Sequence, residues 1–440
     1  MSKHGTVLSM YTEIISEYLK EDPKVIEERI LRARDEYHIP VKYYANHRIF
    51  LVDSEAELER CQEKLLESRR RNQKRLSDIT GMTLEEAEAY INEVYEKAGV
   101  SGKEVLDGQL YGMSMEEIIE WKQKKKETRD ELIHRIMSKT GQDEYWVRKH
   151  MAKCKAIYGI AMGNYENNLC YQLTDEELAT YANLEDSRTL GQKYITVGDE
   201  VLTNKQIFNK TYKEFLGRKY WVNSDTTYRE FRRFVGLKKE VFCKPLDLHG
   251  AYGVFKKEVP FRKRQLYDFF MTQPKMLVEE IIKQDASMAA FYEKSLNTVR
   301  VFTILKDDKF DAFAAFVRFG VDGIADNISA GGIGCGVDEK TGIIITPAVG
   351  NDGILYERHP VTGKVFEGFQ IPKWKEILAL TEKALRKVEG VNYVGWDIAI
   401  TPKGPIIVEG NCVPCLSIYQ SFFAYRKEGR RYKYEKYLED

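Results

Sequence analysis

The chain has 440 residues, about three times a typical domain length, which predicts two or three domains. Its 68 Lys and Arg residues balance 68 Asp and Glu residues, so binding of nucleic acid by bulk charge is not expected. No stretch is apolar over the roughly 18 residues that a membrane-spanning helix needs. The seven cysteines are scattered and odd in number, and the first residues carry no cleavable signal pattern. These features predict a cytoplasmic protein without a disulfide framework.

Residues before about 195 are rich in Glu, Lys, Arg, Leu and Ile at helical spacing. This pattern predicts a mainly helical region, which we divide into residues 1–75 and 76–195. Only residues 41–52 indicate one or two strands. Thr83 and Thr174, each followed three residues later by Glu, predict helix starts.

A weak internal similarity runs through this region at an offset of 60 residues. It pairs Gly81 with Gly141 and Gly99 with Gly159, among other positions. Two stacked helical modules would produce such a pattern. Two unrelated helical stretches would produce it by chance, and the sequence leaves both interpretations open.

After residue 195, short β-branched and aromatic runs alternate with helical segments and are separated by Gly and Pro. This sequence pattern predicts an α+β domain over residues 196–440. Near the end of the chain, residues 425–434 interleave basic and aromatic side chains. That tail is typical of a solvated terminal helix, or of a surface for an anionic glycan or lipid.

The first chemical signal is a short strand that ends at Lys244 and is followed by Gly250 and Gly253. A lysine at a strand end beside a glycine-containing loop suits a phosphate site, because glycine lets backbone N–H groups approach an anion closely. An ordinary turn has the same sequence features.

A hairpin is predicted around a three-residue loop at 402–404, where Pro opens the turn and Gly closes it. That loop pairs Thr401 with Pro405. Counting back along both strands then places Asp397 directly opposite Glu409.

Asn411, two residues beyond Glu409, projects from the same face of this hairpin. The three side chains offer hard oxygen ligands, and the two carboxylates would repel each other without a cation between them. They predict a Mg²⁺ site, with Mn²⁺ as an alternative metal and nucleotide phosphates completing the coordination. A surface hairpin with polar residues facing water is the other interpretation.

Arg300 and Arg318 each interrupt an apolar strand, where an arginine usually points at water or at an anion. A two-residue turn at Asp307 and Asp308 would put them on opposite faces, and a three-residue turn would put them on one face. The sequence does not decide between these turns. Asn327 then begins a loop in which four glycines allow a close backbone approach to a ligand.

Five segments, taken in order, resemble the ATP-grasp superfamily, and especially its sugar-transfer-associated branch related to α-L-glutamate ligases. They are Lys244-Pro with its glycine loop, SLNTVRVFT (295–303), DNISAGG (326–332), YVGWDIAIT (393–401) and GPIIVEGN (404–411). The resemblance covers roughly residues 200 to 425. It implies an α+β ATP-grasp fold of two lobes that clasp ATP, preceded here by the helical region.

The resemblance also implies roles for individual residues. Two lysines would hold the ATP phosphates, the segment 277–282 would lie along adenine with Glu279 as its polar contact, and Asp285 would reach the ribose. The residues implied to bind ATP are Lys205, Lys244, Gly250, Gly253, Glu279, Glu280, Ile282, Asp285 and Asn327. The implied metal ligands are Asp397, Glu409 and Asn411. Arg300 would neutralise the transferring phosphoryl group and the tetrahedral intermediate, together with Lys244 and Arg318.

The activity implied is ATP-dependent ligation of a carboxylate to an amine through an acyl phosphate, with Mg²⁺ as the metal. The branch points to substrates derived from a glycan or an amino acid. A kinase that phosphorylates a small molecule or sugar is one alternative, and a nucleotide-binding scaffold with a degenerate site is another. No nucleic-acid partner is expected, and assembly into a homo-oligomer is left open.

Overall fold

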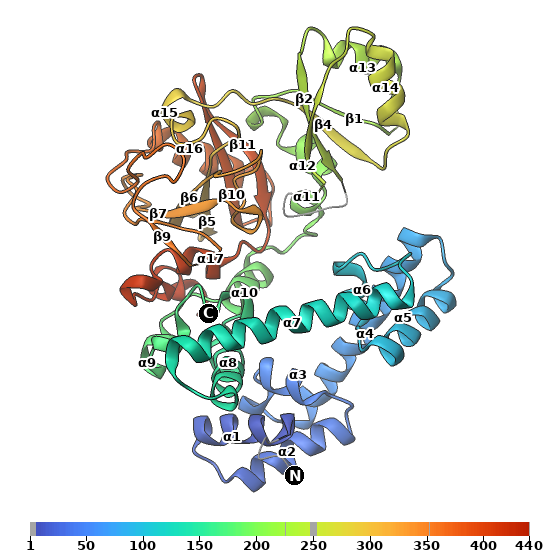
Figure 1. The fold of residues 1–440 in the computed structure, drawn as a ribbon, viewed down its shortest axis with the longest axis vertical. Coiled ribbons are helices and arrows are strands. Elements are labelled where there is room, and N and C mark those ends of the chain that lie inside the picture. The colour runs from blue at the N-terminus through green and yellow to red at the C-terminus, as the bar shows by residue number, and fades with distance from the viewer. Residues whose placement is uncertain (1–5, 225, 247–252, 352, 440) are drawn as a thin grey trace. The chain divides into compact units, whose positions relative to one another are not determined.

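The computed structural model describes residues 6–224, 226–246, 253–351 and 353–439. The chain forms two compact units, Met1–Met162 and Gly163–Asp440 (Figure 1). The division lies earlier than the change of sequence character at residue 195. The reason is α10 (Leu184–Tyr194), whose Leu190 and Tyr194 are buried in a hydrophobic cluster with Phe302 of the C-terminal unit.

The N-terminal unit is helical, as its composition predicts. Its helices are α1 (Val7–Leu19), α2 (Pro23–Asp35), α3 (Val41–Asn46), α4 (Glu55–Thr80), α5 (Leu84–Ala98), α6 (Gly102–Asp107), α7 (Met115–Thr140) and α8 (Glu144–Tyr158). The helix start predicted at Thr83 is confirmed by a capping box with Glu86, and the one at Thr174 by a capping box with Glu177.

The strands expected at residues 41–52 were wrong. This segment forms α3 and a short 3-10 helix at Ile49–Leu51. Its apolar side chains occur in pairs, Tyr44 with Ala45 and Ile49 with Phe50, and all four are buried in the helical core. Pairs spaced by about one helical turn place one face on that core, which alternating strand residues would not do.

The 60-residue spacing recurs in the helices. The helices α4 and α7 both contain 26 residues, and α5 and α8 both contain 15. Gly81 and Gly141 end the longer pair in the left-handed conformation, where glycine avoids the strain of a side chain. Duplication of a helical module stays a prediction that these equal lengths support.

The C-terminal unit has an α+β architecture, as predicted. Its helices are α9 (Asp175–Ala179), α10, α11 (Glu200–Thr203), α12 (Lys205–Thr211), α13 (Tyr228–Val235), α14 (Lys263–Met271), α15 (Ala286–Ala289), α16 (Trp374–Leu385) and α17 (Leu416–Ser421). Its strands are β1 (Tyr220–Val222), β2 (Glu240–Pro245), β3 (Phe255–Glu258), β4 (Met276–Glu280), β5 (Thr298–Lys306), β6 (Lys309–Phe319), β7 (Ile333–Val337), β8 (Ala348–Val349), β9 (Leu355–Tyr356), β10 (Tyr393–Thr401) and β11 (Gly404–Asn411).

A four-stranded sheet in the order β1-β4-β2-β3 forms the smaller lobe. The helices α13 and α14 cover one face of it (Figure 1). Phe231 and Phe270 from these helices pack on Trp221 of β1 in a buried aromatic cluster. Because strand residues alternate between faces, Phe242 and Lys244 of β2 project from the opposite face, which is left for a ligand.

A seven-stranded sheet in the order β11-β10-β5-β6-β7-β8-β9 forms the larger lobe. Its two faces bury separate cores, as alternation along β5 requires. Val299 and Val301 pack with Ile377 of α16 on one face, and Phe302 packs with Phe422, which directly follows α17, on the other. The sheet is therefore covered on both sides and holds its central strands rigidly.

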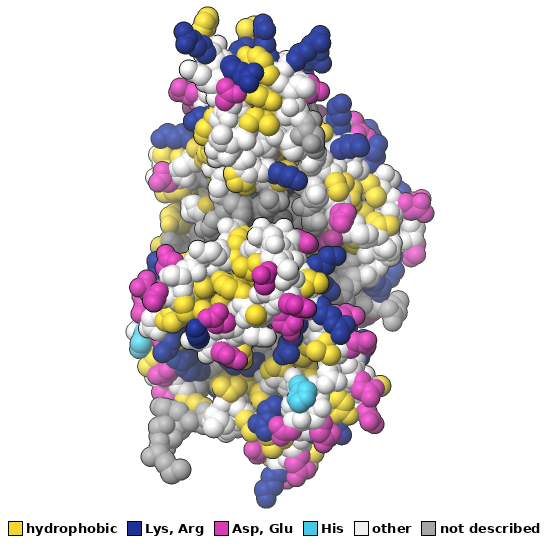
Figure 2. Space-filling model, turned by 90° about the vertical axis from the view of Figure 1, so that its right-hand side faces the viewer, with side chains coloured by type: hydrophobic (Ala, Val, Ile, Leu, Met, Phe, Trp, Pro, Cys, Tyr) yellow, Lys and Arg dark blue, Asp and Glu magenta, His cyan; other side chains and the backbone are white. Residues whose placement is uncertain are grey.

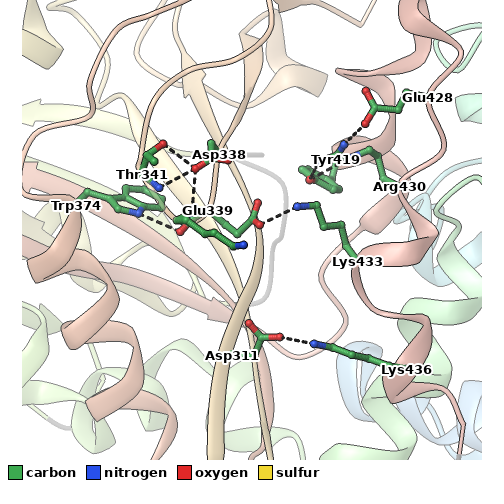
Figure 3. A network of polar contacts seen from close by, with 11 residues as sticks. Asp311, Asp338, Glu339, Thr341, Trp374, Tyr419, Glu428, Arg430, Lys433 and Lys436 are labelled. Carbon is green, nitrogen blue, oxygen red and sulfur yellow. Dashed lines mark hydrogen bonds and ion pairs between the residues drawn. The ribbon is translucent and has the colours of Figure 1, made fainter.

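Part of the basic and aromatic tail packs into this core, so it is not a solvated terminal helix, and its role as a surface for an anionic ligand stays a prediction. Arg430 is only 4% exposed, and its guanidinium lies 3.9 Å from the centre of the Phe423 ring. Nη2 of Arg430 donates to the hydroxyl of Tyr419 at 2.8 Å, and Lys433 forms an ion pair with Glu339 at 2.7 Å (Figure 3). These contacts fasten the tail to the larger lobe.

Positive and negative side chains are mixed over the surface shown in Figure 2, in keeping with the balanced composition. Among the residues that the structure describes, every helix is too short or too polar to span a bilayer.

Candidate active site

A cavity of about 1010 Å³ is lined by residues of both sheets in the C-terminal unit. Most of the residues predicted for the site line it. They are Lys205, Lys244, Glu279, Glu280, Ile282, Arg300, Arg318, Asn327, Asp397, Glu409 and Asn411. Gly253 and Asp285 are not among the lining residues, and Gly250 lies outside the described residues.

The hairpin of β10 and β11 places Asp397 opposite Glu409, as predicted, but by a different route. Thr401 pairs with Gly404, so the loop has two residues and the expected pairing with Pro405 is wrong. The register then shifts between Asp397 and Ile398, which leaves Val408 as an extra residue in β11. This β-bulge restores the pairing of the two carboxylates.

Asp397, Glu409 and Asn411 all line the cavity, and Asn411 is paired with Gly395 on the same face of the hairpin. No cluster of three or more His, Cys, Asp or Glu side chains with metal-binding geometry occurs among the described residues. A divalent ion here would therefore use two carboxylates and one amide oxygen. That donor set fits Mg²⁺ when phosphate oxygens complete the coordination.

Arg300 and Arg318 lie on one face, although the turn between their strands has two residues. Asp307 and Asp308 form that turn, and both adopt positive φ. The register shifts between Phe302 and Thr303, where β6 carries one extra residue. Beyond this point, the side chains of β6 lie on the opposite face of the sheet from the one that simple alternation would give. The sequence could not show this irregularity, which decides where both arginines point.

Both arginines bind Asp397. Arg300 forms a bidentate ion pair with it, and Nη2 of Arg318 lies 3.0 Å from Oδ2. Burial alone would raise the pKa of Asp397, but Arg300 and then Arg318 hold that pKa well below its usual range. Asp397 lies beside Glu409. Burial, followed by the charge of Asp397 and a hydrogen bond with it, raises the pKa of Glu409, although its side chain reaches solvent in the cavity.

Lys244 is held by Glu279. Its Nζ lies 2.7 Å from Oε2 of Glu279, whose side chain is 2% exposed. Arg218 and Asn209 both donate to the other carboxylate oxygen. Burial would raise the pKa of Glu279, but Arg218 and then Lys244 lower it to about 2. The Glu279 carboxylate thus binds side chains of the protein, whereas the resemblance implied that it would contact adenine.

The remaining predicted contacts have local partners. Lys205 donates to the carbonyl of Leu246 at 3.0 Å and lines the cavity at the start of α12. Glu280 accepts from the backbone N–H of Lys219. Asp285 caps α15 by accepting from the backbone N–H of Ser287, so its carboxylate is engaged away from the cavity.

The glycine-rich segment after Asn327 serves packing more than ligand approach. A Cβ atom on Gly334 would lie 2.7 Å from the Phe422 ring, and one on Gly336 would lie 2.5 Å from the Phe423 ring. These glycines let the C-terminal aromatic residues close on β7. Packing therefore accounts for these two glycines, and a backbone cradle for a ligand in this segment stays a prediction.

Sequence reasoning missed two residues of the site. Asp326 is buried, accepts from the backbone N–H of Thr298 at 2.9 Å and lies 3.5 Å from Nε of Arg318. Burial, only partly offset by Arg318, raises its pKa. Arg218 is buried behind Glu279. Asp326 could have been found because it directly precedes Asn327, which was predicted to be in the site. No signal in the sequence indicated Arg218.

Two α+β lobes that enclose lysines, arginines and paired carboxylates define an ATP-grasp fold, and the resemblance is confirmed. Residues 252–424 match the family described as sugar-transfer associated ATP-grasp, which is less than half of the chain. This segment carries Arg300, Arg318 and the three proposed metal ligands. A comparison with curated proteins finds no match.

Several solved structures are similar at low identity. The D-alanine-D-alanine ligase from Coxiella burnetii is 11% identical, with a TM-score of 0.31 over 54% of this chain and 57% of that one. D-alanyl-alanine synthetase A from Vibrio cholerae is 13% identical, with a TM-score of 0.32 over 53% and 62%. The L-amino acid ligase from Bacillus licheniformis is 9% identical, with a TM-score of 0.34 over 55% and 48%. The chain thus spans less than two thirds of each of these proteins.

Proposed function

We propose that this protein is an ATP-dependent ligase that joins a carboxylate to an amine through an acyl phosphate. One observation carries the proposal. A single cavity collects Lys205 from α12, Lys244 from the smaller sheet, and two arginines, two carboxylates and an amide from the larger sheet. Phosphoryl transfer needs positioning and charge neutralisation more than a protein nucleophile, and this set of groups supplies both.

In the first step, Lys205 and Lys244 bind the phosphates of ATP while a substrate carboxylate oxygen attacks the γ-phosphorus. An O–P bond forms, the bond to the β-phosphate oxygen breaks, and ADP leaves. Arg300 and Arg318 neutralise charge on the moving phosphoryl group. Mg²⁺, held by Asp397, Glu409 and Asn411, supplies further neutralisation of the phosphate charge when bound.

In the second step, an amine nitrogen attacks the acyl carbon, a C–N bond forms, and inorganic phosphate leaves with the electron pair of the broken C–O bond. One amine proton leaves with it. Enclosure between the two lobes protects the acyl phosphate from water.

The matched family is associated with sugar transfer. This association supports a substrate, either the donor or the acceptor, that is a glycan or another carboxylate of a polysaccharide pathway. The seven free cysteines support a cytoplasmic location.

Titration calorimetry with AMP-PNP, with and without Mg²⁺, tests the site. We expect binding to the wild-type protein that Mg²⁺ strengthens, and loss of this Mg²⁺ effect in Glu409→Ala with a nearly unchanged melting temperature. Glu389→Ala, an exposed position away from the cavity, is the matched control. A Glu409→Ala protein with the full Mg²⁺ effect would overturn the metal assignment.

Product analysis separates the alternatives. A screen of uronic acids and amino acids for ADP release should yield ADP, phosphate and an amide. A phosphoester product would reassign the protein as a kinase. Absence of any AMP-PNP binding would favour the scaffold whose nucleotide site is degenerate.

A further inference from the structure

Arg218 connects the two lobes behind the cavity without lining it. It lies just before β1, at the edge of the smaller sheet, and its side chain is 2% exposed. On one side, Nε donates to Oε1 of Glu279 at 2.8 Å, and Nη2 lies 2.7 Å from the same oxygen. Glu279 in turn holds Lys244 at 2.7 Å. Glu279 is therefore the single residue that links the Arg218 guanidinium to Lys244, the lysine proposed to bind phosphate.

On its other side, Arg218 binds the backbone of β11. Nη1 donates to the carbonyl of Ile407 at 2.7 Å, and Nη2 donates to the carbonyl of Val408 at 3.0 Å. Nη1 also donates to the carbonyl of Leu216 at 3.2 Å. Four hydrogen bonds, together with the ion-pair contact of Nη2 with Glu279, thus engage the guanidinium on both sides.

The two carbonyls of β11 belong to its β-bulge. Val408 is the extra residue there, and the bulge is what brings Glu409 opposite Asp397. A bulge leaves ladder hydrogen bonds unmade, and buried carbonyls need other donors. Arg218 supplies them. Arg218 thus holds β11, which carries Glu409, and it also holds Glu279, which pairs with Lys244.

From this geometry we infer that Arg218 is a positioning residue that couples the phosphate-binding Lys244 to the metal-binding Glu409. The inference rests on the proposed function, because it assigns a joint role to two parts of that site. Arg218 itself touches no reacting group. It sets the separation between Lys244 on the smaller sheet and Glu409 on the larger one, so that a nucleotide held by the lysine presents its phosphates to the metal ligands.

The test measures AMP-PNP binding with Mg²⁺ and ADP binding without Mg²⁺ in the same protein. In Arg218→Met the bulge loses two donors while Lys244 keeps Glu279 as its partner. We expect the strengthening by Mg²⁺ to fall by about tenfold or more, as for other residues that orient metal ligands. ADP affinity without Mg²⁺ should stay within about twofold, because the hydrogen bonds and charge of Lys244 that ADP uses are unchanged. Arg264→Met, an exposed arginine of α14 in the same lobe, is the matched control.

Two further variants keep the inference falsifiable if Arg218→Met folds poorly. Arg218→Lys keeps the charge but lacks the planar fork, so it should also lose the Mg²⁺ effect. Glu279→Gln keeps an oxygen for Arg218 and removes the charge that holds Lys244. It should show the opposite pattern, with weaker ADP binding and a preserved Mg²⁺ effect.

The outcomes separate this inference from the proposed function. A wild-type protein without Mg²⁺-dependent AMP-PNP binding would overturn both. If the wild-type protein shows that binding, three results would overturn the coupling alone. They are a full Mg²⁺ effect in folded Arg218→Met, an equal loss of both affinities in it, and complete rescue by Arg218→Lys.

Discussion

Arg300 and Asp397 form a bidentate ion pair inside the cavity, on neighbouring strands where the two residues are direct partners. Arg318 approaches the same carboxylate at 3.0 Å. The carboxylate proposed to bind a metal is thus neutralised by the two arginines proposed to act on the phosphoryl group. One buried charge cluster supports both tasks, and removing Asp397 takes away the counter-charge that the two arginines share.

Asp397→Asn should destabilise the ligand-free protein strongly. The substitution leaves two buried guanidinium groups facing an uncharged amide, and breaking a buried pair in this way costs about 3 kcal/mol or more. Urea unfolding would measure the loss. Asp268→Asn is the control, because Asp268 pairs with Arg264 on the surface and its loss should cost less than about 1 kcal/mol. Equal unfolding midpoints for the two variants would contradict the prediction.

The pairing of Asp397 with Glu409 was predicted correctly from a loop of the wrong length. The hairpin loop is one residue shorter than expected, and a bulge at Val408 compensates. The face shared by Arg300 and Arg318 depends on a second bulge in β6. Bulges of this kind leave no trace in the sequence, because an extra apolar residue inside an apolar strand does not disturb its composition.

Other parts of the site depend on contacts between distant segments. Arg218 reaches Glu279, 61 residues away, and Ile407, 189 residues away, so no local pattern could indicate it. The larger lobe was predictable because its strands alternate and its polar residues stand out against apolar neighbours. The starts of two helices, at Thr83 and Thr174, were predictable from their capping residues. The burial of Arg430 in the tail was not predictable, because the sequence does not show that this segment folds so that Arg430 lies against Phe423 and Tyr419.

The ion pairs of Glu279 should make the stability of the protein depend on acid pH. The pKa of Glu279 falls from its ordinary value of 4.5 to about 2 in the folded protein. A lowered pKa means that the stabilisation is complete above about pH 4.5 and is lost as the pH falls to about 2. The shift corresponds to a contribution on the order of 3 kcal/mol.

Urea unfolding of the wild-type protein and Glu279→Gln between pH 6 and about 2.5 would measure this contribution. The difference between their unfolding free energies should be largest above pH 4.5 and shrink as the pH falls through this window. A difference that stays constant over the whole range would show that the charge of Glu279 contributes nothing.

Gly336→Ala should destabilise the larger lobe. The added methyl group would lie 2.5 Å from the Phe423 ring, and the sheet and α17 hold that ring in place. Overpacking of this kind costs about 1–3 kcal/mol. Thermal unfolding would detect it as a lower melting temperature. Gly198→Ala is the control, since a Cβ atom there meets no atom within 4 Å. The packing argument fails if both variants melt at the same temperature.

Lys244→Met should weaken nucleotide binding without unfolding the protein. The methionine keeps an unbranched apolar stem, and Glu279 retains Arg218 as a buried counter-charge. Loss of a charged contact with phosphate costs about 1.5–3 kcal/mol, which corresponds to about a tenfold to hundredfold lower affinity for ADP. Because this contact does not involve a metal, the loss should be the same with and without Mg²⁺. Calorimetry with Lys239→Met, an exposed lysine before the same strand, provides the control. Unchanged ADP affinity in Lys244→Met would remove this lysine from the phosphate site and, with it, one side of the coupling through Arg218.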